Sequence, residues 1–119
     1  MQYIMLIYTQ EKAERSQEEL QKLRNTHWTV MDEGSKKGVL RAAQPLKPVN
    51  TATTLRMQNG KALTTDGPFA ETKEQLAGYY IFECQNLDEA IDWAAKIPSA
   101  CGGASGCIEI RPLADLPPR

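Results

Sequence analysis

One six-residue segment near the start of the chain constrains the fold more than any other. The residues YIMLIY at positions 3–8 are apolar at odd and even positions alike. Successive side chains of a β-strand point to opposite faces of its sheet. The pattern therefore predicts a strand that is covered on both faces, and any fold of this chain must supply an apolar layer on each side of it.

Two helices are predicted to provide one of these layers. Ser16 and Glu19 have the spacing of a capping box, which marks the start of a helix. A second helix is predicted to begin at Asn86 or Asp88 and to stop at Pro98, because proline cannot continue a helix. The first helix is predicted to face the sheet with a stripe of residues that recur at helical spacing: Leu20, Leu23, His27, Val30 and Met31.

The remaining segments favour β-structure. Residues 39–46, 77–84 and 108–113 are predicted strands, and residues 99–106 form a loop of small residues. The dipeptide Asn59-Gly60 lies between two alternating runs and predicts a two-residue hairpin turn, since both central positions need a positive φ. The strand pairs expected from such a turn are Met57 with Ala62, Leu55 with Thr64, and Thr53 with Asp66.

The order of these elements is a βαββαβ plan with an extra hairpin in the middle. Both helices are expected on one face of an antiparallel sheet, which leaves the other face bare. A second copy of the chain is the simplest cover for that face, because large exposed apolar surfaces are rare in monomers. We therefore expect a homodimer.

Composition excludes several classes of function. A chain of 119 residues is the size of one domain, taken here as 1–119, and its 14 basic and 15 acidic residues form no like-charged block that would bind nucleic acid. The N-terminal apolar run is far shorter than the roughly 20 residues that a membrane span requires, so a cytoplasmic location is expected. Three cysteines without C-x-x-C spacing and a single histidine predict no metal site, and the absence of nucleotide motifs predicts no cofactor.

Four segments together resemble a known family. They are MQYIMLIY at the start, ATTLR at residues 52–56, DGPFAETKEQLAGYY at residues 66–80 and IEIRPL near the end. They are similar to the YCII-related family, whose members carry a DGPF domain, and the likeness covers essentially the whole chain. The resemblance implies a ferredoxin-like α+β fold that pairs into a dimeric α+β barrel. It also implies a His-Asp pair in those relatives proposed to be enzymes, and an association of DGPF proteins with alternative sigma factors.

Asp66 and His27 are the candidate catalytic residues. The expected register places Asp66 on the same side of the hairpin as Leu55 and Met57, where apolar cover would raise the pKa of its carboxyl and suit it to acid-base chemistry. The alternative is a turn opener whose carboxylate accepts a backbone amide. His27 is either a buried core residue or, if it reaches Asp66, a base that Asp66 orients.

Six further residues are candidates for substrate binding. Acidic residues beside the DGPF turn can complement a helix start, and a lysine there can form an ion pair. A tyrosine hydroxyl or a strand arginine can orient a substrate, although such residues also serve as core, interface or edge positions. The candidates are Phe69, Glu71, Lys73, Glu74, Arg56 and Tyr79.

Two functions follow from these residues. The first is a cofactor-independent enzyme of the lyase or isomerase type that acts on a small organic molecule, with Asp66 as acid or base. The alternative is a non-catalytic dimeric module that binds a ligand or a protein, in which the DGPF motif is a folding element. The family resemblance implies that such a module works beside a transcription regulator.

Overall fold

The computed structural model describes residues 1–98 and 106–119, and its elements follow the predicted order. The loop expected at residues 99–106 lies outside the described residues, apart from Gly106. The elements are β1 (Gln2–Thr9), α1 (Gln17–Lys36), β2 (Leu40–Pro45), a 3-10 turn (Val49–Thr51), β3 (Thr53–Gln58), β4 (Lys61–Asp66), β5 (Gln75–Glu83), α2 (Leu87–Ala94) and β6 (Gly106–Pro112).

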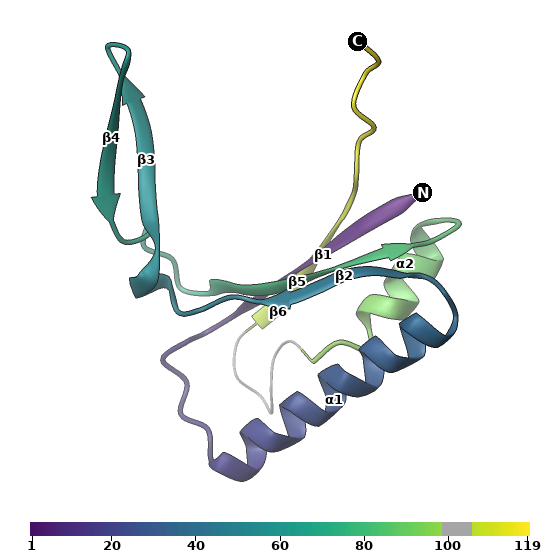
Figure 1. Ribbon diagram of the computed structural model, residues 1–119. Coiled ribbons are helices and arrows are strands. Elements are labelled where there is room, and N and C mark those ends of the chain that lie inside the picture. The colour runs from purple at the N-terminus through teal and green to yellow at the C-terminus, as the bar shows by residue number, and fades with distance from the viewer. Residues whose placement is uncertain (99–105) are drawn as a thin grey trace.

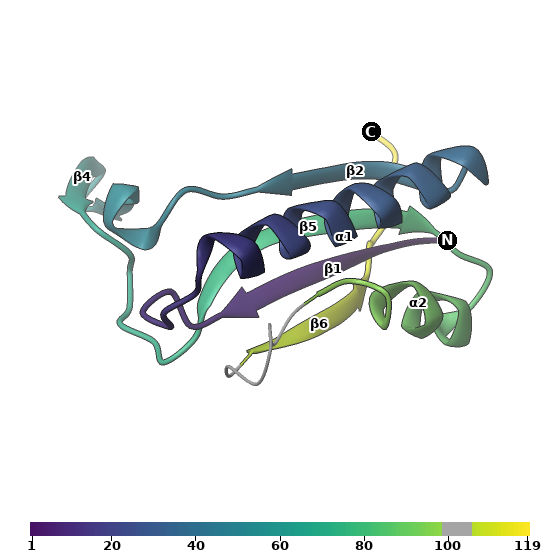
Figure 2. The same cartoon turned by 90° about the horizontal axis from the view of Figure 1, so that it is seen from below.

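The main sheet has four antiparallel strands in the order β2-β5-β1-β6. Strands β3 and β4 pair only with each other and form a separate hairpin. With α1 and α2 both on one side of the sheet, this is the predicted ferredoxin-like α+β fold with an inserted hairpin (Figures 1 and 2). β1 is one of the two central strands, so both of its edges are paired.

Both helices begin where the sequence predicts. The Ser16 hydroxyl accepts the backbone N–H of Glu19 at 3.1 Å, and the Asn86 side chain accepts that of Glu89 at 2.9 Å. The predicted stop at Pro98 is wrong, because α2 ends at Ala94 and the backbone then tightens into turns that carry it toward the proline. Neither helix in the described part of the chain has the length and apolarity to cross a membrane.

The core lies between the helices and one face of the sheet. Alternate residues of β1 and β5 are buried there, and Trp93 of α2 stacks on Phe82 with 4.7 Å between ring centroids. The buried strand residues are Tyr3, Met5, Ile7, Tyr80 and Phe82, and Cys84 is buried just after β5. On the other face, Ile4, Leu6 and Tyr8 of β1 are only half-buried. The apolar layer that the sequence requires on that side is therefore not supplied within one chain.

The hairpin has the register that the sequence predicts. Thr53 pairs with Asp66 and Met57 with Ala62, and both turn residues have positive φ, 51° at Asn59 and 77° at Gly60. Figure 1 shows that the hairpin and the C-terminal tail both rise on the side of the sheet that the helices do not cover. All six residues of β4 are exposed.

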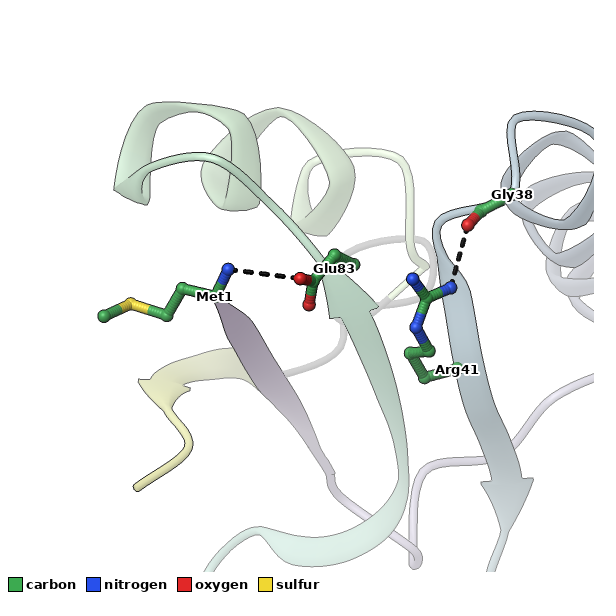
Figure 3. Close-up of polar contacts among 4 residues, drawn as sticks. All are labelled: Met1, Gly38, Arg41 and Glu83. Carbon is green, nitrogen blue, oxygen red and sulfur yellow. Dashed lines mark hydrogen bonds and ion pairs between the residues drawn. The ribbon is translucent and has the colours of Figure 1, made fainter. Parts of the chain in front are cut away.

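Two polar contacts lie at the end of the main sheet where β1 and β2 begin and β5 ends (Figure 3). The amino group of Met1 lies 3.3 Å from Oε1 of Glu83, and Nη1 of Arg41 donates to the carbonyl oxygen of Gly38 at 2.8 Å. These groups are exposed, so the contacts add little to the free energy of unfolding.

Gly34 provides a test of the packing between α1 and the sheet. A Cβ at this position would lie 2.9 Å from Cε1 of Phe82 and 3.1 Å from Cβ of Leu40. Alanine normally stabilises a helix relative to glycine, but we expect Gly34→Ala to lower the free energy of unfolding by about 1–3 kcal/mol through overpacking. The exposed neighbour gives the control, Ser35→Ala, which should change it by less than about 0.5 kcal/mol in the same denaturant titration. A more stable Gly34→Ala variant would contradict this packing.

Candidate functional site

A cavity of about 560 Å³ lies between α1 and the β2–β5 edge of the main sheet. This volume is in the range of pockets that hold small organic molecules. The walls are largely apolar and aromatic, and they include Ile7, Leu23, Trp28, Met31, Tyr79 and Tyr80. The polar groups at the cavity are few, and three of them are nitrogen bases or cations: His27, Arg15 and Arg24.

His27 and Tyr80 form a hydrogen-bonded pair in the wall of this cavity. Nδ1 of His27 lies 2.7 Å from the Tyr80 hydroxyl, and that hydroxyl also approaches the backbone carbonyl of His27 at 3.4 Å. Burial lowers the pKa of His27 below its ordinary 6.5 and raises the pKa of Tyr80 to about 12. At neutral pH the imidazole is therefore uncharged and the phenol is protonated.

An aromatic ladder holds this pair in place. His27 stacks on Tyr80 at 5.8 Å between ring centroids, Tyr80 on Phe82 at 5.7 Å, and Phe82 on Trp93 at 4.7 Å. Tyr80, Phe82 and Trp93 are buried, so the ladder joins His27 to the core. A side chain that is packed in this way keeps one orientation, which acid-base chemistry requires.

Arg15 is the least satisfied polar group of the site. Nε and Nη2 of its guanidinium are shielded from solvent, and neither has a hydrogen-bond partner among the described residues. Arg24 is exposed on α1, where Nη2 lies 3.5 Å from Oε1 of Gln21. Within the described residues the cavity wall contains no carboxylate. The cavity is thus lined by cations whose charges no acidic wall residue offsets.

The structure brings two of the eight predicted site residues to this cavity. They are His27 and Tyr79. The other six do not belong to its described wall. His27 bonds to Tyr80 and not to Asp66, because α1 and the hairpin lie on opposite sides of the main sheet (Figure 1). The expected contact between His27 and Asp66 is therefore not formed within one chain.

The expectation that Asp66 is sheltered from water is wrong for the single chain. The register is as predicted, but Leu55 and Met57, which were expected to cover the carboxylate, are themselves 59% and 65% exposed. The reason is that the hairpin stands away from the main sheet and pairs with none of the strands in it (Figure 1). Asp66 is consequently exposed at the end of β4.

The DGPF motif closes the base of the hairpin through its glycine. Gly67 has a φ of 101°, its N–H donates to the carbonyl of Ala52 at 2.7 Å, and its own carbonyl accepts the Thr54 hydroxyl at 2.8 Å. The carboxylate of Asp66 makes no hydrogen bond to any residue that the structure describes. The turn is therefore held by backbone groups and not by an aspartate cap.

The remaining candidates lie around this turn. Residues 71–74 form no helical turn, so the condition under which Glu71 and Glu74 would share a face is not met. Glu71 and Lys73 are exposed, and Glu74 lies half-buried with Oε1 at 3.8 Å from Sγ of Cys107. Phe69 is 78% exposed and Arg56 is exposed on the hairpin.

The cavity residues that were not predicted as site residues include Tyr80, Arg15, Arg24 and Trp28. Alternation along β5 separates Tyr79 from Tyr80 but does not say which of the two faces the helices. Arg24 lies one helical turn before His27, which is a signal that spacing could have provided. Arg15 directly precedes the capping Ser16, and a sequence pattern gives no indication of where such a side chain points.

No group of three or more potential ligands that could hold a metal ion comes together within residues 1–98 and 106–119. The thiols in that part of the chain, Cys84 and Cys107, are free, and their pKa values are raised, mainly by burial. Raised pKa values make both thiols poor nucleophiles at neutral pH. The chemistry of the described cavity therefore depends on imidazole, phenol and guanidinium groups.

The lowered pKa of His27 predicts a pH dependence of stability. The unfolded chain binds a proton to this imidazole near pH 6.5, whereas the folded chain does so only at lower pH. The contribution is therefore fully present above the unfolded pKa and is lost as the pH falls from there toward the folded pKa. We expect His27→Gln to flatten this part of the pH profile of the free energy of unfolding. Because His27 is the only histidine, its titration can also be followed directly by NMR, and a pKa at or above 6.5 would contradict the burial.

Comparison with known proteins identifies the family. A sequence model of the YCII-related domain matches residues 1–117. An uncharacterized protein of Rhizobium meliloti (strain 1021) is 39% identical over 116 residues, a match that covers 96% of this chain and 93% of that protein. The chain therefore belongs to the YCII-related domain family.

Proposed function

We propose that the chain is a cofactor-independent enzyme that transfers protons on a small organic molecule bound in the cavity, with His27 as general base and acid. The observation that carries this proposal is the 2.7 Å contact between Nδ1 of His27 and the Tyr80 hydroxyl in the cavity wall. This proposal assigns to His27 the acid-base role that was expected of Asp66.

The pair supplies a base at neutral pH. A neutral imidazole has one N–H and one lone pair, and the Tyr80 hydroxyl can satisfy Nδ1 in either state. It donates to a bare Nδ1, or it accepts from Nδ1–H while its own proton turns toward the carbonyl of His27 at 3.4 Å. In the second arrangement Nε2 carries the free lone pair, and it has no hydrogen-bond partner among the described residues. Nε2 is then the atom that accepts a substrate proton.

A lyase or isomerase reaction needs little beyond a base that is held in one orientation beside the substrate. Nε2 of His27 takes a proton from a carbon beside a carbonyl group, and the electron pair moves into the carbonyl or expels a leaving group. The imidazolium then returns the proton to a different atom in an isomerisation, or to the departing group in an elimination. General acid-base catalysis of this kind is worth about 10²–10⁴-fold in rate. Trp28 and Leu23 of α1 hold the substrate body against the sheet.

Proton transfer can be tested without knowing the substrate. The protein is incubated in D2O with a panel of small ketones, keto acids and unsaturated lactones, and loss of the C–H signal is followed by NMR. We expect exchange of at least one compound, a reduction of at least about 100-fold in His27→Gln and of about 10-fold in Tyr80→Phe. Thr26→Ala changes the exposed neighbour of His27 on α1 and should leave the rate unchanged.

Asp66→Asn separates this site from the hairpin. If it abolishes exchange while His27→Gln does not, the acid-base centre lies at the DGPF turn and the proposal is wrong. If no compound exchanges although the cavity binds ligands, the alternative holds, and the chain is a non-catalytic binding module. That alternative is supported by the large exposed apolar side chains of the hairpin, Leu55, Met57 and Leu63.

We also propose that a second copy of the chain covers the bare face of the main sheet. Ile4, Leu6 and Ile81 are half-buried on that face, and the hairpin and the C-terminal tail flank it (Figure 1). An isolated two-stranded hairpin is at best marginally stable in water. Packing against the same partner would therefore stabilise the hairpin as well. A twofold pair of this kind would be the dimeric α+β barrel that the family resemblance implies.

Sedimentation velocity tests the dimer. We expect the wild-type protein to sediment with twice the chain mass of 13.3 kDa. Leu6→Glu should give a monomer, because it would bury an unpaired charge at the interface. Met57→Glu changes a residue on the hairpin, outside the core, and should weaken the dimer without unfolding the chain. The control is Ile91→Glu, which changes an exposed residue of α2 on the helix side. A wild-type monomer at high concentration would contradict the proposal.

A further inference from the structure

The geometry points to an organic monocarboxylate with an apolar or aromatic body as the ligand of the cavity, bound through the guanidinium of Arg15. This inference takes the location of its site from the proposed function, but it concerns what binds there and not whether His27 catalyses a reaction. Its basis is a cationic side chain whose hydrogen-bonding groups are desolvated and unpaired beside a cavity.

The unpaired atoms of Arg15 are the two that matter for carboxylate binding. Nε–H and Nη2–H point in the same direction along one edge of the guanidinium, and this edge matches the two oxygens of a carboxylate in a bidentate pair. Both atoms are shielded from solvent and have no partner among the described residues. Leaving buried donors unpaired costs free energy, and more so when they are charged. Because this edge is shielded as it stands, a carboxylate reaches it only when the guanidinium turns toward the cavity. That contact removes the cost of the unpaired donors and gains two charge-assisted hydrogen bonds.

The surrounding charges favour one negative group on the ligand. The described wall contains no aspartate or glutamate that could satisfy Arg15 internally. The second arginine of the wall, Arg24, is exposed and lies 3.5 Å from the Gln21 side chain. Among the residues that the structure describes, Arg15 alone presents a shielded edge without a partner, and one such edge corresponds to one carboxylate.

The rest of the wall specifies the body of the ligand. Trp28 is 62% exposed although it is a large aromatic residue, and it borders the cavity. Leu23, Met31 and Ala43 add apolar surface to the same wall. Aromatic and aliphatic walls favour a compact hydrocarbon or ring. A substrate of this class would present its carboxylate to Arg15 and its reacting carbon to His27.

Calorimetric titration with a matched pair of probes tests the inference. Phenylacetate and phenylacetamide have the same size and ring, but only the first carries the negative charge. We expect the wild-type protein to bind phenylacetate at least tenfold more tightly. Arg15→Gln should weaken phenylacetate at least tenfold and leave phenylacetamide unchanged. Arg15→Lys keeps the charge without the bidentate edge and should lose part of the affinity, about threefold to tenfold.

The matched control removes a guanidinium elsewhere. Arg41 is exposed on β2 and bonds to the carbonyl of Gly38 (Figure 3), so Arg41→Gln should change the phenylacetate affinity less than twofold. Circular dichroism and thermal unfolding confirm that each variant is folded. If Arg15→Gln does not fold, Arg15→Lys and the wild-type preference for the acid decide the question.

Three results would overturn the inference: no binding of phenylacetate or of 4-methylpentanoate, equal affinity for acid and amide, or an equal effect of Arg15→Gln and Arg41→Gln. Binding of the acid without deuterium exchange would leave this inference standing and would contradict only the proposed catalysis. Exchange of neutral ketones without any preference for acids would support the proposed catalysis and contradict this inference.

Discussion

The two-sided burial required by β1 is the constraint on which the rest of the structure depends. This strand lies between β5 and β6, and every side chain along YIMLIY, residues 3–8, is apolar. The helices satisfy one side, where Met5 and Ile7 are buried, whereas Leu6 on the other side is only half-buried. The two faces therefore have different roles: one forms the core and the cavity, and the other is the surface on which we propose that a second copy packs.

The candidate site is an extension of the core. Trp93, Phe82 and Tyr80 stack in sequence, and His27 adds a polar ring at the end of this ladder where the cavity begins. Burying a phenol and an imidazole would cost free energy if each were alone, but their mutual hydrogen bond offsets part of that cost. The same packing that stabilises the fold thus fixes the orientation of the base, so that no separate loop is needed to position it.

Local patterns predicted the fold well, because each depends on a few neighbouring residues. Asn59-Gly60 determines the register of the hairpin through its positive φ angles, and Ser16 and Asn86 determine the helix starts through their caps. The environment of Asp66 could not be predicted in this way. Register says which side chains share a face of the hairpin, but burial depends on what packs against that face, and Leu55 and Met57 on that face stay exposed in the single chain.

The interpretation of His27 shows a second limit of sequence patterns. Its place on the apolar stripe of α1 allowed either a core residue or a catalyst, and the structure combines features of both, since the ring packs on Tyr80 and also lines the cavity. Tyr80 lies on β5, 53 residues after His27 in the chain. Alternation gives the spacing of Tyr79 and Tyr80 but not the face on which α1 lies. Only the packing of α1 on the sheet selects Tyr80 as the partner.

The proposed ligand and the proposed base are linked by electrostatics. Burial keeps His27 neutral, and a neutral imidazole is the form that can accept a proton. A carboxylate held by Arg15 would bring a negative charge into the same cavity, and a nearby negative charge favours the protonated imidazole. Ligand binding would then raise the basicity of His27 at the moment when a substrate is present. In the empty cavity His27 stays uncharged and imposes no unpaired buried charge on the fold. Stability and proton transfer therefore both require a neutral imidazole at this position.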